Sequence, residues 1–202
     1  MVKMTFRWYG EKDPVTLDKI AQIPTMTGIV SAVYDVAPGG VWSEESIRKI
    51  GDAAAAKNLE FEVVESVPVA EDIKLGTGKA ADLIDVYCEN VRRLGRAGVK
   101  CICYNFMPVF DWLRSELEHQ NADGSNSLAY DDATVRAMNP LTSELSLPGW
   151  DESYTKEELR GLLKQYEQMP EEQLWKNMHT FLEAVIPVAE ASGIRMAIHP
   201  DD

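Results

Sequence analysis

The chain has 202 residues, with 33 acidic and 20 basic side chains and a formal net charge of −13. A chain this acidic is not suited to bind nucleic acid or an anionic membrane surface, because both are themselves negatively charged. No apolar run reaches the roughly 20 residues of a membrane span, and no signal-peptide pattern follows Met1. Three cysteines without a Cys-x-x-Cys spacing favour a reducing compartment, so we expect a cytoplasmic protein.

Short β-rich runs alternate with amphipathic helical segments in the first half of the chain. The pattern predicts strands at 4–9, 28–33, 59–64 and 99–105, and helices at 15–23, 44–57 and 80–97. Ser43 is a suitable N-cap for the second helix. The third helix carries one apolar stripe, formed by Leu83, Ile84, Tyr87, Val91 and Leu94. The segment around Gly76 and Gly78 is predicted to be a loop.

The alternation breaks at Met107 and resumes near Glu171. Residues 107–170 predict an insertion that contains a hairpin turn at 121–126 and short helices near 132–138 and 156–168. A long helix at 171–192, with Pro187 as a kink, and a strand at 194–199 follow it. Connections of this length are usually functional, so we expect either a lid or an interface.

Strands that alternate with helices predict an α/β fold with a parallel sheet, either an open doubly wound sheet or a (β/α)8 TIM barrel. No GxGxxG or GxxxxGK[ST] motif follows a strand, so nucleotide binding in the open-sheet manner has no support. Polar or aromatic residues end all five predicted strands, which favours a barrel. We therefore expect residues 1–202 to form one incomplete TIM-barrel domain of about five βα units, with the insertion after the fourth strand.

The ending His199-Pro200-Asp201-Asp202 is the sharpest local signal. A neutral imidazole at the carboxyl end of a strand is a natural ligand for a divalent metal, and nearby carboxylates can coordinate the metal or orient the imidazole. The alternative is a polar loop with helix-capping aspartates. His179 is expected on a helix surface, and His119 in a solvated turn unless the insertion folds over the site.

Other candidates lie at the remaining strand ends. Arg7 could clamp a carboxylate or pair with an acid, and it points away from its neighbour Trp8. Ser31 and Asn105 are of the kind that bind sugar hydroxyls, while Glu65 could be a base, a metal-organising group or an ion-pair partner.

The cysteines and tryptophans have simpler interpretations. Cys101 and Cys103 face one side of their strand and are expected to be buried and unpaired, with Cys88 in the core or at its boundary. Packing is expected for Trp112, Trp150 and Trp175.

Four blocks distributed along the chain together resemble mannonate dehydratase. They are 4–10 (MTFRWYG), 26–32 (MTGIVSA), 104–112 (YNFMPVFDW) and 196–202 (MAIHPDD). The resemblance implies a metal-dependent TIM barrel related to xylose isomerase. It also implies dehydration of D-mannonate to 2-keto-3-deoxy-D-gluconate in hexuronate breakdown, with Mn2+ or Fe2+. On this basis His199 is a metal ligand, and Arg7, Trp8, Ser31 and Asn105 line the substrate pocket.

The family's chains are longer, and this difference defines the remaining expectations. The resemblance places the other metal ligands (a cysteine, a histidine and an aspartate) and the acid/base residues beyond Asp202, so we expect this chain alone to bind metal weakly and to be inactive. A homo-oligomer that binds a sugar acid is expected. The alternatives are another sugar or sugar-acid isomerase on the same barrel, and a non-catalytic half-barrel that binds a partner at its open sheet edge.

Overall fold

The computed structural model describes residues 2–110, 114–138 and 154–199. The chain divides into two compact units: one contains the residues up to Phe106 and the described residues 171–199, and the other contains Met107–Pro170. Within the described ranges, no helix is both long enough and apolar enough to cross a membrane.

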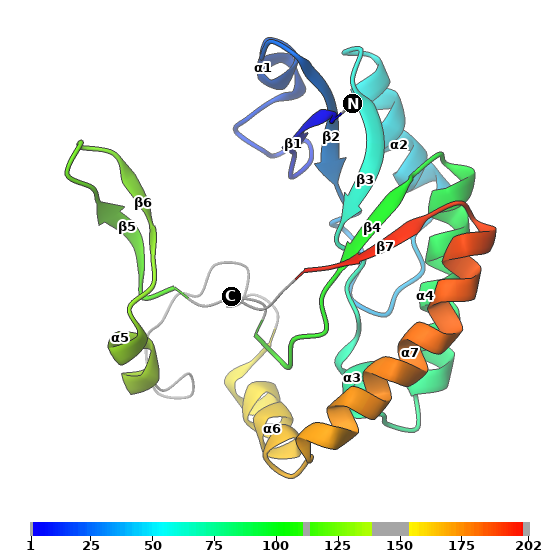
Figure 1. Ribbon diagram of the computed structural model, residues 1–202, viewed down its shortest axis with the longest axis vertical. Helices are drawn as coiled ribbons and strands as arrows, with labels where there is room; N and C mark the ends of the chain where they lie inside the picture. The colour runs from blue at the N-terminus through cyan, green and yellow to red at the C-terminus, as the bar shows by residue number, and fades with distance from the viewer. Residues whose placement is uncertain (1, 111–113, 139–153, 200–202) are drawn as a thin grey trace. The chain divides into compact units, whose positions relative to one another are not determined.

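The first unit is built on a five-stranded parallel sheet (Figure 1). Its strands are β1 (Met4–Arg7), β2 (Met26–Ser31), β3 (Glu60–Glu65), β4 (Cys101–Tyr104) and β7 (Arg195–Ile198), in the spatial order β1-β2-β3-β4-β7. Every neighbouring pair is parallel, so the five carboxyl ends meet at one edge of the sheet. The predicted α/β fold with a parallel sheet is confirmed.

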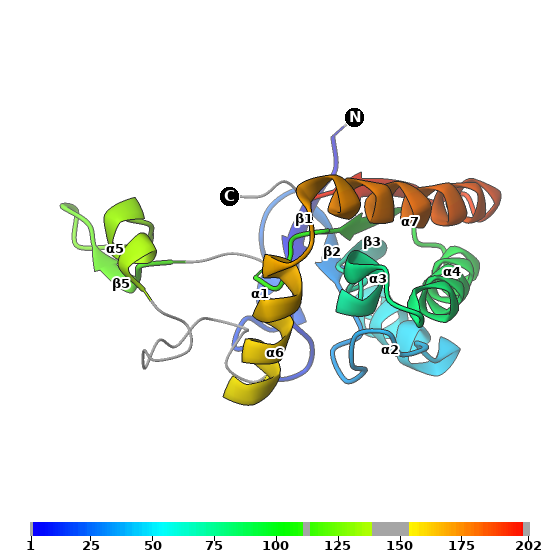
Figure 2. The same cartoon turned by 90° about the horizontal axis from the view of Figure 1, so that it is seen from below.

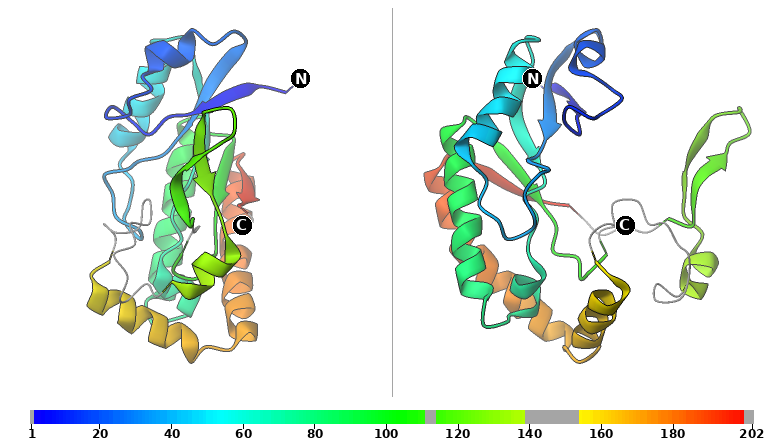
Figure 3. Two further views of the ribbon diagram at one scale, coloured as in Figure 1. Left: turned by 90° about the vertical axis from the view of Figure 1, so that its left-hand side faces the viewer. Right: turned by 180° about the vertical axis from the view of Figure 1, so that it is seen from behind.

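Helices join these strands. They are α1 (Leu17–Ala21), α2 (Glu44–Ala55), α3 (Glu71–Leu75), α4 (Ala80–Arg96) and α7 (Glu171–Ala191). The long helices α2, α4 and α7 lie along one face of the sheet (Figures 2 and 3). Ser43 caps α2 as predicted, since its hydroxyl accepts a hydrogen bond of 2.9 Å from Ser46 N. Helix α3 replaces part of the predicted loop, because five residues are too few for a helical period to be recognised.

The strand register separates two faces of the sheet. Residues in register share a face, and one row consists of Ser31, Val64, Ile102 and Met196. The side chains of Val64 and Ile102 have no exposed surface, so this row faces the helices. The opposite face, called the open face below, carries two rows that remain partly exposed: Arg7, Val30, Val63, Cys101 and Arg195, followed by Glu65, Cys103 and Ala197.

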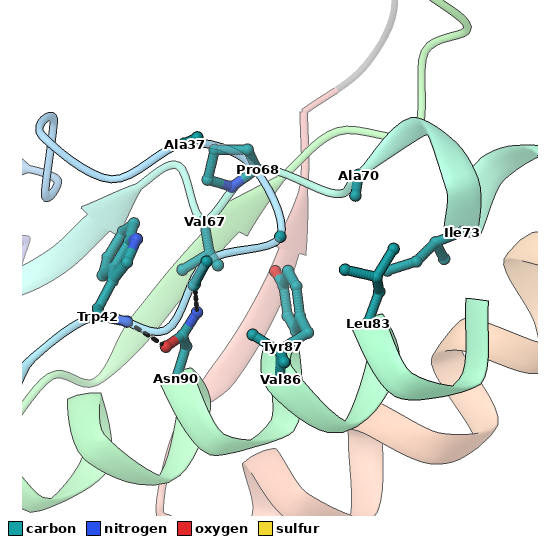
Figure 4. A pocket seen from close by; sticks show the side chains of 12 residues that line it. Ala37, Trp42, Val67, Pro68, Ala70, Ile73, Leu83, Val86, Tyr87 and Asn90 are labelled. Carbon is teal, nitrogen blue, oxygen red and sulfur yellow. Dashed lines mark hydrogen bonds between the residues drawn. The ribbon is translucent and has the colours of Figure 1, made fainter. Parts of the chain in front are cut away.

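A buried amide joins α4 to the loop after β2. Asn90 is 3% exposed; its Oδ1 accepts a hydrogen bond of 2.8 Å from Trp42 N, and its Nδ2 donates one of 2.9 Å to Gly40 O (Figure 4). Two backbone groups that would otherwise be buried without partners are thereby satisfied. The adjoining cavity measures about 10 Å³, which leaves room for about one water molecule but not for a sugar acid.

The described part of the second unit contains an antiparallel hairpin and two helices. The hairpin strands are β5 (Glu116–Gln120) and β6 (Asn126–Ala129), and the helices are α5 (Asp132–Ala137) and α6 (Lys156–Glu167). The turn forms where it was predicted, with Asn121 N donating to Ser125 O at 2.8 Å. Thr155 and Glu158 form a reciprocal capping box at the start of α6.

Gly76→Ala is expected to lower the free energy of unfolding by about 2 kcal/mol. Gly76 ends α3 with φ of +66°, a conformation that alanine adopts at a cost, and an added Cβ would lie 2.7 Å from Asn177 Oδ1. Asn177 cannot easily move, because it is 9% exposed and its Nδ2 donates to Lys74 O at 2.8 Å. Urea denaturation followed by circular dichroism measures the change.

Gly78→Ala is the matched control for this variant. No φ in the left-handed range occurs at Gly78, and no atom lies within 4 Å of its added Cβ. Its effect should stay within about 0.5 kcal/mol. Equal midpoints for the two variants would contradict the argument.

Candidate functional site at the carboxyl edge of the sheet

Arg7, the last residue of β1, lies on the open face beside Glu65 of β3. Its Nη1 is 3.0 Å from Glu65 Oε2, and its guanidinium carbon is 4.9 Å from the centre of the Tyr9 ring. Arg7 Nε and Nη1 are buried but make no hydrogen bond within the part of the chain that the structure describes. The contact with Glu65 is therefore an ion pair without hydrogen-bond geometry, and two buried guanidinium donors have no hydrogen-bond partner among the described residues.

Asn105 and His199 follow neighbouring strands at the same edge. The backbone pairing of β4 with β7 continues one step beyond Tyr104 and Ile198, because His199 N donates to Tyr104 O at 2.7 Å. The alternation along both strands then places Asn105 and His199 on the open face, next to the row of Glu65, Cys103 and Ala197.

The metal-ligand prediction at His199 rests on one described residue. Its imidazole is an exposed nitrogen donor of the kind that suits Mn2+ or Fe2+. Among the described side chains, no three His, Cys, Asp or Glu groups converge on a possible metal position. Asp201 and Asp202 lie outside the described residues. His199 is therefore chemically suited to be one ligand of a metal site. The described residues do not bring a complete set of ligands together around it.

Trp8 and Ser31 lie on the other side of the strand ends. Trp8 is 5% exposed and packs among apolar residues of α1 and β2, including Leu17, Ile20 and Ile29. Ser31 has no exposed surface and donates a hydrogen bond of 2.7 Å to Trp8 O. The structure therefore places these two residues on the helix-covered side of the sheet, opposite the open face, where they hold the end of the strand that carries Arg7.

Cys103 lies between Glu65 and Ala197 in the register of the open face. Burial, with smaller contributions from Cys101 and Glu65, raises the pKa of the Cys103 thiol to about 11. The described cysteines are free thiols, and Cys88 is buried on α4, so the prediction of unpaired cysteines is confirmed. Cys101 and Cys103 keep part of their surface exposed, which differs from the expected burial.

Alkylation of Cys103 by iodoacetamide at pH 8 should be about 100-fold slower in the folded chain than in urea. A thiol with a pKa of about 11 is about 0.1% ionised at this pH, compared with about 10% for an ordinary pKa of 9.0. Time-resolved peptide mass spectrometry measures both rates. Similar rates in the two states would show that the fold does not protect this thiol.

The remaining histidines and tryptophans lie away from this edge. His119 is exposed on β5, with Nδ1 2.9 Å from Glu116 Oε2, and His179 is exposed on α7, 3.3 Å from Glu183. Both surface predictions are confirmed. The packing prediction for Trp175 is wrong, because its position on α7 leaves it 61% exposed. Trp112 and Trp150 lie outside the described residues.

A larger hollow in the first unit lies away from this edge, against α2, α4 and the start of β3. It measures about 570 Å³. Its arginines are paired, Arg96 with Glu44 at 2.6 Å and Arg93 with Glu89 at 2.9 Å. In parallel α/β folds, ligands bind at the carboxyl ends of strands, so this hollow is not the candidate site.

Sequence reasoning missed that Arg7 contacts both Tyr9 and Glu65, and that Glu65 is aligned with Cys103. The signal was present in the alternation, because Arg7 and Tyr9 are two residues apart, as are Cys101 and Cys103. What the pattern lacked was the register that aligns Glu65 with Cys103.

Comparison with known proteins identifies the family. The family model described as "D-mannonate dehydratase (UxuA)" matches residues 2–202. The chain is 53% identical over 201 residues to mannonate dehydratase of Streptococcus agalactiae serotype Ia, and 50% identical over 201 residues to that of Oceanobacillus iheyensis. The alignment covers 100% of this chain and 58% of each relative, so the chain spans little more than half their length.

A solved structure agrees with these matches. The crystal structure of mannonate dehydratase from Streptococcus suis serotype 2 superposes with a TM-score of 0.89 at 44% identity, over 100% of this chain and 54% of that one. This chain therefore shares its fold with the matching part of that structure. The chain belongs to the mannonate dehydratase family.

Proposed function

We propose that this chain supplies the first five strands of a TIM-barrel enzyme. This enzyme dehydrates D-mannonate to 2-keto-3-deoxy-D-gluconate in hexuronate breakdown. Residues 107–170 are then an insertion after the fourth strand of that barrel. The observation that carries the proposal is the grouping of Arg7, Glu65, Asn105 and His199 at the carboxyl edge of the open face. We also propose a cytoplasmic homo-oligomer, in keeping with its free cysteines.

Each residue at this edge has a role that its chemistry supports. The Arg7 guanidinium binds the substrate carboxylate, and the Asn105 amide hydrogen-bonds a hydroxyl. Trp8 and Ser31 do not face the substrate side of the sheet; they hold the end of β1 in place from its helix-covered side. Glu65 pairs with Arg7 and limits where the guanidinium can point. His199 provides one nitrogen ligand to the metal.

The dehydration removes a proton from the carbon next to the carboxylate and a hydroxyl group from the following carbon. A bound Mn2+ or Fe2+ supplies Lewis acidity that makes this proton easier to remove. Arg7 and Asn105 orient the substrate so that the proton and the departing hydroxyl meet a base and an acid. The acid and base themselves are proposed to lie beyond Asp202, in the part of the family's length that this chain does not span.

A chimaeric enzyme tests this proposal. The chain replaces the matching part of the Streptococcus agalactiae relative, which it resembles at 53% identity. With Mn2+ or Fe2+, the chimaera is expected to form keto acid from D-mannonate, and His199→Ala should abolish both tight metal binding and product formation. Isothermal titration with Mn2+ and a keto-acid assay measure the two effects.

His179→Ala is the matched control, because it removes an exposed imidazole from α7 and should change neither readout. Circular dichroism verifies that each variant is folded. A folded, metal-binding chimaera that converts a neutral sugar but not D-mannonate would favour the isomerase alternative. One that converts neither would favour the non-catalytic half-barrel.

A further inference from the structure

The peptide group between Trp8 and Tyr9 is held on both its polar sides, immediately after β1. Its carbonyl oxygen, Trp8 O, accepts hydrogen bonds from Ser31 Oγ at 2.7 Å and from Tyr34 Oη at 3.2 Å. Its N–H, that of Tyr9, donates to Asp13 Oδ2 at 2.8 Å. Three side chains thus fix one peptide group, and with it the direction in which the Tyr9 side chain leaves the backbone.

Asp13 is itself fixed by the chain around it. Its other carboxylate oxygen, Oδ1, accepts a hydrogen bond of 2.8 Å from Val15 N, just before α1. Its backbone N–H donates to Gly10 O at 2.9 Å, which closes a turn. An aspartate that bonds the backbone two residues ahead from within a turn has few other positions available. The carboxylate that holds Tyr9 N is therefore well ordered.

The ring of Tyr9 contacts two further side chains. The guanidinium carbon of Arg7 lies over this ring, 4.9 Å from its centre, which is within the range of cation–π attraction. The ring of Tyr34 is 6.1 Å away between centroids, with 36° between the two planes. Tyr34 thus supports Tyr9 twice, by its hydroxyl group at the backbone and by its ring at the side chain.

Arg7 is therefore held by two groups of different kinds. Glu65 Oε2 attracts Nη1 from 3.0 Å, and the Tyr9 ring attracts the delocalised charge of the guanidinium through its negative face. A free arginine side chain has many rotamers, and their loss on binding weakens affinity. An arginine that is already ordered when the substrate arrives loses less entropy and binds more tightly.

We propose that Tyr9 is a positioning residue that orders Arg7 for the substrate carboxylate, with Tyr34 and Asp13 holding Tyr9 in place. This inference rests on the proposed function, because it takes Arg7 as the group that binds the carboxylate. The contacts that carry it join residues 7–34 to one another and to Glu65. In a barrel, the carboxyl ends of the strands form the mouth where substrates bind, so Tyr9 acts from that mouth.

Substitutions of Tyr9 in the chimaeric enzyme test the inference. Tyr9→Leu removes the aromatic face and should lower kcat/KM for D-mannonate by about fivefold, mainly through a higher KM, since this is the size of a moderate cation–π contact. Tyr9→Phe keeps the ring and should stay within about twofold of the unaltered chimaera. Trp175→Leu is the control: it removes an equally exposed ring, 61% in both cases, from α7 and should change neither kcat nor KM.

A double-mutant cycle separates an action through Arg7 from a general effect on the fold. In the Arg7→Gln background, Tyr9→Leu should cost less than about twofold, because the group that Tyr9 orders is already gone. The same fivefold loss in both backgrounds would indicate a merely structural role and overturn the inference. Equal losses from Tyr9→Leu and Tyr9→Phe would overturn it too. Circular dichroism verifies that every variant is folded.

The same assays distinguish this inference from the proposed function. A strong loss in Arg7→Gln, with none in Tyr9→Leu, would overturn only the positioning role of Tyr9. A chimaera that forms no keto acid from D-mannonate, or one whose kcat/KM is unchanged by Arg7→Gln, would overturn both the role of Arg7 and the inference that rests on it.

Discussion

Phe181→Ala is expected to lower the free energy of unfolding by about 3–5 kcal/mol, the largest stability effect among the variants considered. Phe181 has no exposed surface at the centre of the main apolar cluster. Its ring packs edge-on against Tyr87, with 4.9 Å between centroids, and lies 5.8 Å from both Tyr104 and Phe106. Alanine would remove these contacts and leave a cavity that the surrounding rings cannot fill completely.

The position of Phe181 explains why this loss is expected to be global. It joins α7 to α4 and to the end of β4, segments that are far apart in the chain. Trp175→Ala on the same helix is the control, because Trp175 is 61% exposed and its loss should cost no more than about 0.5 kcal/mol. Urea denaturation followed by circular dichroism compares the two. A Phe181→Ala loss below about 1 kcal/mol would show that the ring cluster is not the centre of this core.

In the chimaeric enzyme, Arg7→Gln is expected to reduce kcat/KM for D-mannonate by about 30-fold or more. The reason is that a partly buried cation that pairs with the substrate carboxylate contributes about 2–5 kcal/mol, and each 1.4 kcal/mol corresponds to about tenfold. Arg7→Lys should give a kcat/KM between those of the unaltered chimaera and of Arg7→Gln, because an ammonium keeps the charge but not the planar fork. Steady-state assays of keto-acid formation measure the change.

Lys3→Gln is the matched control, since it removes the same charge from the other end of β1. Lys3 Nζ lies 2.6 Å from both Glu60 and Glu62 and is well exposed, so its loss should leave kcat/KM within about twofold. If Arg7→Gln were equally mild, the carboxylate would have to be bound by another residue. A loss in kcat alone, with unchanged KM, would instead indicate a role for Arg7 in positioning.

Local patterns predicted most of the first unit. The apolar stripe of α4 and the N-cap at Ser43 follow from hydrogen bonding and periodicity within a few residues, so they can be recognised without knowing the neighbours. The same reasoning failed for Trp175, because periodicity identifies one apolar side of a helix but not whether another element covers each position on it.

The candidate site was predictable in its members but not in its grouping. Strand ends identified Arg7, Asn105 and His199, since parallel strands bring their carboxyl ends to one edge. The pairing of Arg7 with Glu65, and the placement of Trp8 and Ser31 behind the strand, depend on register. A shift of one residue would exchange the two faces, and no local pattern determines that choice.

The acidic composition argued against nucleic-acid and anionic-membrane partners from the beginning, because net charge acts at long range and does not depend on the fold. The sequence by itself also determined the alternation of strands and helices, the family resemblance and the cysteine spacing. Only the tertiary structure decided which side chains share the open face, which arginine donors lack hydrogen bonds, and that Cys88 is buried in the core while Cys101 and Cys103 lie on the open face. Those properties arise from contacts between segments distant in the chain, and such contacts exist only after the sheet has formed.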